Sequence, residues 1–425
     1  MERVMGSQEE MVCGTRRRTE AKMKDQVEPR MDRRRFLGQG AAAGLGLIAL
    51  PEFLRDGSWR GSGSRERILL VLEFVGGNDG LNMIVPTERD AYYRARPKLG
   101  LRRGLLSLGE GFAVPRGMEG FHRLFKEGEA AVIHGVGYKG HERSHFRSRD
   151  IWHSGRPELK KPQEGWLGRV LSELRGFLPA AAVGDVELTL ALRSKRRSVP
   201  ALENVDDLRL DWDPRRAHER RWLQRLAALQ KGSEGLAAEV GQVATASMEQ
   251  AERLRKAFAA WKPKARFPSD RLGRGMRFAA SLFEAPLDTR VVYLRHFGFD
   301  THAGQQRTHP QILRSFSQAV WALRNQLRAS GLWERCCLFC WSEFGRRLAE
   351  NKSLGTDHGW AGPVLLLGGG LKGGFHGSFP SLTELDDGDP KVGVDFRSVY
   401  RSLLEDWMGL PKAPYKVKKL PGLFA

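Results

Sequence analysis

The chain has 425 residues, enough for two or three ordinary domains or for one large domain that carries an insertion. Its 70 Lys and Arg against 50 Asp and Glu give a formal charge of +20, while 41% hydrophobic residues and 11 Trp exclude a chain that is disordered throughout. No apolar run reaches the about 18 residues that a bilayer-crossing helix needs, so we expect no transmembrane span. Four cysteines, at positions 13, 336, 337 and 340, are too few and too clustered for a disulfide framework.

The first 64 residues are typical of an export signal. Residues 1–30 are polar and lack apolar periodicity, so we expect a non-native or disordered extension that precedes a start at Met31. Residues 31–64 contain RRRFL at 33–37 and then a short Gly/Ala-rich apolar segment, the pattern of a twin-arginine signal for folded cargo. A buried Gly/Ala helix is the alternative. The signal predicts a periplasmic or extracellular protein that the twin-arginine machinery exports, anchored at the membrane if the leader is uncleaved.

Short apolar runs alternate with helical stretches over residues 65–425. The first, at 67–75, has the near-continuous apolar sequence of a buried parallel strand and ends in two glycines. Further strands are expected at 130–136, 181–192, 290–297, 335–341 and 363–367. Apolar residues at three- and four-residue spacing predict an amphipathic helix at 308–330. This alternation predicts one layered α/β domain.

Two segments depart from that alternation. Between about 200 and 262 the sequence is dense in Arg, Ala, Leu and Glu without a strand-like run, which predicts a helical insertion. The Gly-rich stretch at 367–374 lacks the following Lys-Ser/Thr of a phosphate-binding loop, so we expect a loop or hairpin there.

The positive charge belongs to the folded part. Residues 1–64 hold 12 basic and 9 acidic side chains, which leaves +17 on the remainder. Such a charge attracts anionic polymers and surfaces. The sequence has no helix-turn-helix, zinc-finger or aromatic-basic RNA-binding pattern, so we expect a solvated basic surface and no specific nucleic-acid partner.

Polar residues collect where the predicted strands end, and in doubly wound sheets ligands bind at that edge. Asp79 follows the first strand, although Asp beside Gly also suits a simple turn. Ser144 follows the second strand and is either a nucleophile or a helix N-cap. Asp300 and His302 follow the strand at 290–297 and offer oxygen and nitrogen ligands to zinc or a related ion.

The last such segment follows the strand at 335–341. Glu343 lies at its end, and Asp357 and His358 come later in a Gly-flanked loop. The cysteines of this strand are expected to be buried thiols, with 336 and 340 on one face and 337 on the other. Because four polar clusters each follow a separate strand, a metal or phosphoester-type site is a fair expectation.

Five motifs in this order resemble the secreted bacterial family known as domain of unknown function 1501: GGNDGLN at 76–82, RSHF at 143–146, GFDTH at 298–302, SEFGRR at 342–347 and GTDHG at 355–359. The resemblance covers nearly all of residues 67–410. That family is grouped with the alkaline phosphatase and sulfatase superfamily. The resemblance implies a three-layer sandwich around a mostly parallel sheet, and metal-dependent hydrolysis of phosphate or sulfate esters.

The resemblance also implies roles for individual residues. One or two divalent ions, zinc, calcium or magnesium, would be held by Asp79, Asp300, His302, Glu343, Asp357 and His358. Ser144 has the place of the nucleophile, and His145 that of a ligand or base. Arg143 and Arg346 are candidates for neutralising the oxygens of a small or polymeric anionic ester, because guanidinium matches phosphate and sulfate geometry.

The pattern departs from the superfamily in the close spacing of Asp300 and His302 and in the position of Glu343, where the superfamily usually has an Asp-His pair. His376 is a candidate for the usual final histidine, or it lies on the surface of a hairpin. The competing hypothesis is a non-catalytic exported surface or polymer-binding protein that keeps the fold.

Overall fold

Strand β1 (Ile68–Val75) is buried along almost its whole length and pairs with a parallel strand on each side. One neighbour is β8 (Val291–Phe297) and the other is β9 (Cys336–Ser342). A strand in this position has no solvent face, which explains why its sequence is apolar at nearly every residue rather than at alternate ones.

The computed structural model describes residues 66–425, except 141, 177, 185–186, 198, 204–224, 226–227, 229–255, 257, 259 and 412. The expected extension at 1–30, the signal at 31–64 and nearly all of the helical insertion at about 200–262 therefore lie outside the described residues. Among the described residues, no helix combines the length and apolar character needed to cross a membrane.

The described strands form a nine-stranded sheet in the order β11-β5-β10-β9-β1-β8-β6-β7, with β14 also paired to β5. The strands not yet bounded are β5 (Ala130–Gly137), β6 (Ala180–Val183), β7 (Ala201–Leu202), β10 (Gly362–Leu367), β11 (Gly374–His376) and β14 (Val394–Asp395). Strand β10 is antiparallel to both of its neighbours, and the other pairings are parallel. The predicted α/β class with a mostly parallel sheet is thus confirmed.

Most predicted strands agree with the structure to within a residue or two. The strand expected at 181–192 is wrong in length, because β6 ends at Val183 and Gly184 follows with a φ of +79°. Residues Leu190–Leu192 form a short 3₁₀ helix instead. The expected helix at 308–330 is α10 (Gln305–Ala329).

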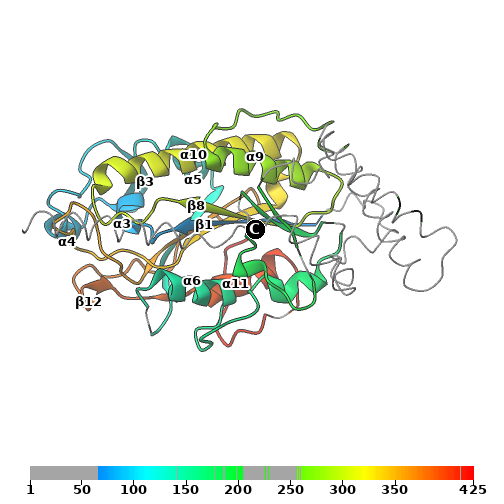
Figure 1. Ribbon diagram of the computed structural model, residues 1–425. Helices are drawn as coiled ribbons and strands as arrows, with labels where there is room; N and C mark the ends of the chain where they lie inside the picture. The colour runs from blue at the N-terminus through cyan, green and yellow to red at the C-terminus, as the bar shows by residue number, and fades with distance from the viewer. Residues whose placement is uncertain are drawn as a thin grey trace, which may run out of the picture. The chain divides into compact units, whose positions relative to one another are not determined.

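Helices cover both faces of the sheet (Figure 1). One layer holds α5 (Glu119–Lys126), α9 (Arg271–Glu284) and α10. The opposite layer holds α6 (His145–Ser154) and α11 (Phe396–Arg401), which continues into a π-helical turn at Ser402–Trp407. The described part of the chain is therefore a three-layer sandwich.

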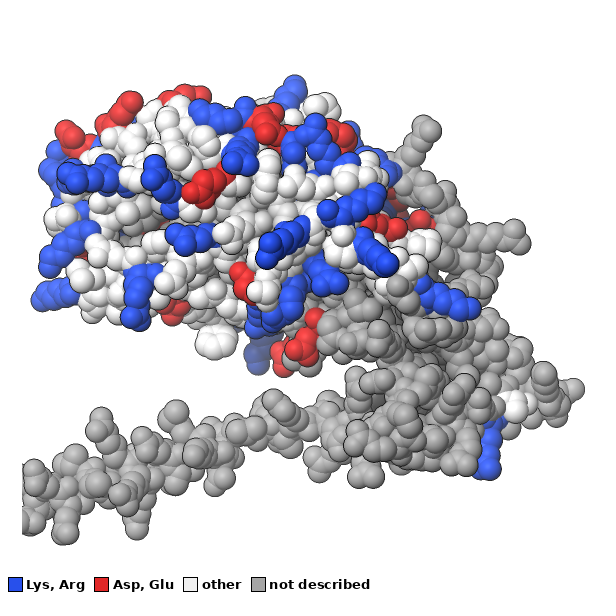
Figure 2. Space-filling view, turned by 90° about the horizontal axis from the view of Figure 1, so that it is seen from above, with Lys and Arg blue, Asp and Glu red and all other residues white. Residues whose placement is uncertain are grey.

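The outer side of the α9 and α10 layer carries scattered charge. Figure 2 looks down on this layer and shows basic side chains spread over the described surface, with acidic and uncharged ones between them. This distribution is typical of a solvated basic surface rather than of one continuous anion-binding track.

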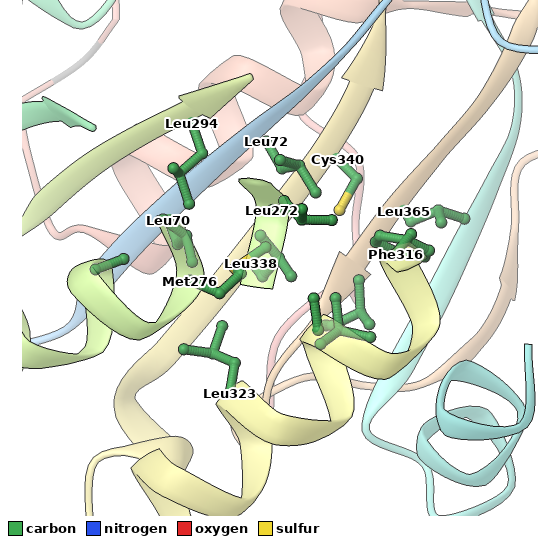
Figure 3. Close-up of a cluster of buried hydrophobic side chains, with 14 of the residues drawn as sticks. Leu70, Leu72, Leu272, Met276, Leu294, Phe316, Leu323, Leu338, Cys340 and Leu365 are labelled. Carbon is green, nitrogen blue, oxygen red and sulfur yellow. The ribbon is translucent and has the colours of Figure 1, made fainter. Parts of the chain in front are cut away.

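The alternation of side chains along each strand divides the core into two clusters, one on each face. Leu70 and Leu72 of β1 pack with Met276 of α9 and Phe316 of α10 (Figure 3). Leu69 and Val71, by contrast, belong to the cluster under α6 and α11.

The cysteines of β9 follow the same alternation. Cys336 and Cys340 lie in the first cluster and Cys337 in the second, as the strand period predicts. All three are buried free thiols, and burial raises their pKa values. They are therefore packing residues without thiolate chemistry.

Smaller elements complete the described part. Helices α3 (Gly80–Met83) and α4 (Asp90–Ala95) follow β1, and β2 (Val85–Pro86), β4 (Phe112–Pro115) and β3 (Leu105–Gly109) form a small antiparallel sheet. Strands β12 (Leu385–Asp386) and β13 (Asp389–Pro390) make a hairpin. Two more 3₁₀ helices lie at Gly168–Glu173 and Trp333–Arg335.

Candidate metal centre

The parallel strands β1, β5, β8 and β9 bring the segments that follow them to one edge of the sheet. Asp300, His302 and His358, predicted as ligands, lie together there, and His145 joins them from the first residue of α6. This is the arrangement expected from polar residues at the carboxyl ends of parallel strands.

The three imidazoles surround the Asp300 carboxylate. The Nε2 atoms of His302 and His358 lie 2.8 Å apart, and they are 3.2 and 3.3 Å from Asp300 Oδ1. His145 Nε2 is 3.6 Å from Asp300 Oδ2. One potential ligand atom each from His145, Asp300 and His358 lies within 4.8 Å of the others. The His302 side chain is 43% exposed, so the cluster is open to solvent.

The other nitrogen of each ring faces an oxygen that accepts hydrogen bonds. The three pairs are His145 Nδ1 with Glu343 Oε1 at 2.9 Å, His302 Nδ1 with Asp357 Oδ1 at 3.0 Å, and His358 Nδ1 with the Arg143 carbonyl at 2.8 Å. A carboxylate or a carbonyl cannot donate, so each Nδ1 carries the proton. In the neutral ring, each Nε2 then presents a lone pair to the cluster.

The surroundings of the cluster favour the unprotonated forms of His358 and Asp300. Burial lowers the pKa of His358, with help from the charges of Arg346 and His145, although the hydrogen bond to the Arg143 carbonyl opposes the shift. Burial opposes ionisation of Asp300, but the hydrogen bond and the charge of Arg346 outweigh it and lower the pKa of this carboxyl. The centre therefore combines a carboxylate with a neutral imidazole, and both are good ligands for zinc.

Glu343 lies behind His145. It is fully buried, and its carboxylate accepts the N–H groups of Gly76 at 2.9 Å and Gly77 at 3.1 Å. Gly76 has a φ of +121°, and a Cβ there would lie 2.4 Å from the Asp300 nitrogen. The glycines thus allow the loop after β1 to lie against the Asp300 segment while its N–H groups hold Glu343. Glu343 orients the ring of His145 from the side away from Nε2.

Arg346 lies behind Asp300. It is buried, and its Nη2 is 2.8 Å from Asp300 Oδ1. Its remaining donors bind backbone carbonyls, namely those of Gly76 at 2.5 Å, Gly77 at 2.6 Å, Thr356 at 2.6 Å and Phe299 at 3.1 Å. The guanidinium therefore joins three loops of the site, and its buried position makes it a support for Asp300.

Asp79, expected as a ligand, belongs to a different network. Its Oδ2 is 2.7 Å from Arg96 Nη1 and 2.5 Å from Gln305 Nε2, and the residue is buried. Burial opposes its ionisation, but the charges of Arg96 and His309 lower its pKa. None of the contacts found for it in the described chain involves the three imidazoles. The reason is local, since Asp79 precedes α3 and its charge is neutralised by the arginine that follows α4.

Ser144 occupies the N-cap of α6, one of its two expected positions. Its Oγ accepts a long hydrogen bond, 3.5 Å, from the backbone N–H of Arg147. The residue is exposed and directly precedes His145. The cap is thus present, and the side chain is exposed.

Asn351 belongs to the candidate site, although none of the sequence motifs includes it. Its Nδ2 donates to Asp357 Oδ1 at 2.9 Å and to the His302 carbonyl at 3.0 Å. The Asp357 pKa is lowered first by this hydrogen bond and then, against burial, by His302. Asn351 Oδ1 accepts from the N–H of Ser353 and Gly355. The sequence signal that could have identified Asn351 is an Asn at the start of a turn that contains Gly355.

His376, the candidate final histidine, is not brought to the centre. It lies in β11, paired with Ile133 in the middle of β5 rather than at its end. Its Nε2 is 2.9 Å from the Lys372 carbonyl. Since β11 pairs in parallel with β5 and His376 is half-buried, the expected surface position in a hairpin is wrong as well.

Comparisons with known proteins give a family and distant structural likenesses. No curated protein matches the chain. A zinc complex of the C-terminal periplasmic domain of EcEptC from Escherichia coli is 10% identical, with 84% of this chain and 86% of that chain covered and a TM-score of 0.40. The PsFucS1 sulfatase from Pseudoalteromonas sp. is 12% identical, with 82% and 68% covered and a TM-score of 0.35.

Likenesses of this size carry no argument about activity. The family is shown by a family model that matches residues 66–414, well over half of the chain. The chain therefore belongs to the family described as "Protein of unknown function (DUF1501)".

Proposed function

We propose that this protein is an exported, metal-dependent hydrolase of phosphate or sulfate esters, with a divalent ion held by Asp300, His302, His358 and His145. The observation that carries the proposal is the convergence of three imidazole Nε2 atoms on one carboxylate, while each Nδ1 donates to an acceptor outside the cluster. Histidines that bind metals characteristically donate their second nitrogen in this way.

The repulsion between lone pairs supports a cation at this position. In neutral rings the Nε2 atoms of His302 and His358 would face each other unprotonated at 2.8 Å. A proton on one ring satisfies one such contact, whereas a divalent ion accepts lone pairs from every ring and from Asp300. Nitrogen donors with one carboxylate favour zinc over calcium or magnesium, which prefer oxygen ligands.

Glu343 and Asp357 then act as orienting carboxylates rather than ligands, because each holds the Nδ1 side of a histidine. Asp79 stays outside the proposed ligand set, since Arg96 already neutralises it. Of the six ligands expected from the sequence, Glu343 and Asp357 thus contact a histidine rather than the proposed ion. Asp79 belongs to a separate network with Arg96.

Ser144 is the proposed nucleophile. A divalent ion bound at the cluster would polarise an ester oxygen and lower the pKa of a nearby hydroxyl. Ser144 is exposed and directly precedes His145, and within the described part of the chain its hydroxyl makes one long hydrogen bond. It also lies at the N-terminus of α6, where the partial positive charge of the helix stabilises a developing negative charge.

Metal content and turnover of three variants test this function together. We expect wild-type protein to bind about one equivalent of zinc per chain and to hydrolyse generic phosphate or sulfate esters. His358→Ala should lose both metal and turnover. Ser144→Asn should keep the metal and lose turnover, because asparagine preserves the N-cap but removes the hydroxyl.

The matched control is His122→Ala, which removes a histidine of α5 whose Nε2 contacts the Ser107 carbonyl. It should keep both properties. Unchanged metal content in His358→Ala rejects the site. Salt-sensitive binding of anionic polymers without turnover in the wild type would instead support the competing surface-protein hypothesis.

A further inference from the structure

Two arginines beside the metal centre share two aspartates that differ sharply in exposure. Arg143 Nη2 lies 2.8 Å from Asp387 Oδ2 and 2.6 Å from Asp389 Oδ2. Arg347 Nη2 lies 3.2 Å from Asp387 Oδ2, and its Nε lies 3.7 Å from Asp389 Oδ1. The Asp389 side chain is completely buried, whereas that of Asp387 is 64% exposed.

This difference in exposure makes Asp389 the fixed carboxylate of the cluster and Asp387 the exchangeable one. Separating the buried Asp389 carboxylate from Arg143 would leave its charge unpaired, so this pair is fixed, whereas the Asp389 ion pair with Arg347 is looser. The pairs with Asp387 are exposed, screened by salt and individually weak, so that side chain can leave at little cost. Without Asp387, the two arginines and Asp389 carry a net positive charge.

Both arginines belong to the segments that build the metal centre. The Arg143 carbonyl accepts the hydrogen bond from His358 Nδ1, and Arg143 precedes His145 by two residues. The Arg347 N–H donates to the Asp357 carbonyl at 3.0 Å, and the Arg347 charge helps to lower the pKa of that carboxyl. The backbones of both arginines thus contact ligand loops of the proposed site, and the charge of Arg347 acts on Asp357, the partner of His302.

The chain holds Asp387 at this position by a tight turn. Asp387 and Gly388 connect β12 to β13 with φ values of +50° and +80°, which are those of a two-residue hairpin turn. Arg347 Nη2 also donates to the Asp387 carbonyl at 2.7 Å. Arg143 lies over the Trp360 ring at 5.1 Å, which supports its guanidinium plane. The carboxylate at the hairpin tip thus presents its oxygen to two arginines, as a tetrahedral oxyanion would.

We propose that Arg143 and Arg347 bind the anionic phosphate or sulfate group of the substrate, and that the Asp387 carboxylate occupies this subsite when substrate is absent. The inference rests on the proposed function, whose substrate class it explains. Asp387 competes with the anion and sets the affinity, Asp389 keeps Arg143 in position, and the guanidinium forks provide the match to oxyanion geometry.

Binding of inorganic sulfate and phosphate to the intact protein, measured by calorimetry at low salt, tests the subsite. Asp387→Asn should tighten binding by roughly tenfold, equivalent to about 1.4 kcal/mol, because asparagine tolerates the positive φ and removes the competing charge. Asp386→Asn is the matched control, since it removes an exposed carboxylate from the neighbouring position of the same hairpin. It should change the affinity far less.

Arg347→Lys in the Asp387→Asn background should reverse the gain, because lysine keeps the charge but loses the planar fork. Equal effects of Asp387→Asn and Asp386→Asn would overturn the proposal, since a general change of surface charge would then explain both. A gain specific to Asp387→Asn in a protein without ester turnover would keep the anion site and reject the hydrolase. Turnover without any such gain would reject this subsite alone.

Discussion

At the scale of single residues, the two glycines after β1 show how the absence of a side chain determines the site. Gly77 has a φ of +75°, and a Cβ there would lie 2.3 Å from the Phe344 ring. The N–H groups of Gly76 and Gly77 hold Glu343, which orients His145. Their carbonyls accept hydrogen bonds from the arginine that holds Asp300. One short turn therefore supports both sides of the metal centre.

Gly76→Ala should destabilise the protein and weaken metal binding. Its φ of +121° is strained for alanine, and the added Cβ meets the backbone of Asp300. Gly109→Ala is the matched control, because Gly109 has a φ of +102° but a Cβ added there would meet no atom within 4 Å. We expect Gly109→Ala to cost about 1–3 kcal/mol and Gly76→Ala clearly more. Chemical denaturation and zinc titration measure both effects, and equal costs would show that the close approach is unimportant.

At the scale of elements, helix α6 is anchored to the centre of the sheet by Glu73 of β1. The buried Glu73 carboxylate accepts from Arg149 Nε at 3.0 Å and His153 Nε2 at 3.0 Å, both on α6. It also accepts from the Tyr293 hydroxyl at 2.8 Å, on β8. Since α6 begins at His145, this anchor fixes where that ring enters the metal centre.

The charge of Glu73 predicts a defined loss of stability in acid. Burial opposes its ionisation, but the charge and hydrogen bond of His153 and the charge of Arg149 lower its pKa from 4.5 to about 2. A folded-state pKa below the unfolded value stabilises the protein above pH 4.5, and this contribution disappears as the pH falls towards 2. The contribution is roughly 3 kcal/mol at neutral pH.

Glu73→Gln should therefore unfold more easily than the wild type at pH 7, and the difference should shrink between pH 4.5 and about 2. Urea denaturation across this range measures it. Glu88→Gln, at an exposed position, is the control and should follow the wild type. A difference that does not depend on pH would mean that packing, rather than charge, explains the role of Glu73.

At the scale of the whole molecule, the sequence predicts that the proposed chemistry takes place after export. The signal at 31–64 lies outside the described residues, so it stays a prediction from the sequence. A folded-cargo route suits a protein that acquires its metal before export, because the ligands come from distant segments and meet only in the folded state. The buried thiols of β9 likewise need no oxidising compartment.

Replacing Arg33, Arg34 and Arg35 together with Lys should keep the precursor in the cytoplasm, since lysine retains the charge but not the guanidinium geometry. Arg55 and Arg60, which follow the apolar segment within residues 31–64, supply the control. The same replacement there should leave export unchanged. Cell fractionation with immunoblotting measures both, and normal export of the first variant through the folded-cargo route would contradict the assignment.

Local sequence determined the strands and the motifs at their ends. The apolar run at 67–75 became β1, and the prediction that Asp300, His302 and His358 lie at strand ends agrees with their grouping, because parallel strands share one carboxyl edge. Only the tertiary structure decided which groups contact the histidines. Glu343 lies 198 residues from His145 in the chain, and Asp79 is neutralised by Arg96, so neither role follows from spacing. Hydrogen bonds and ion pairs form between atoms that are close in space, whereas a sequence pattern reports mainly on burial and local backbone conformation.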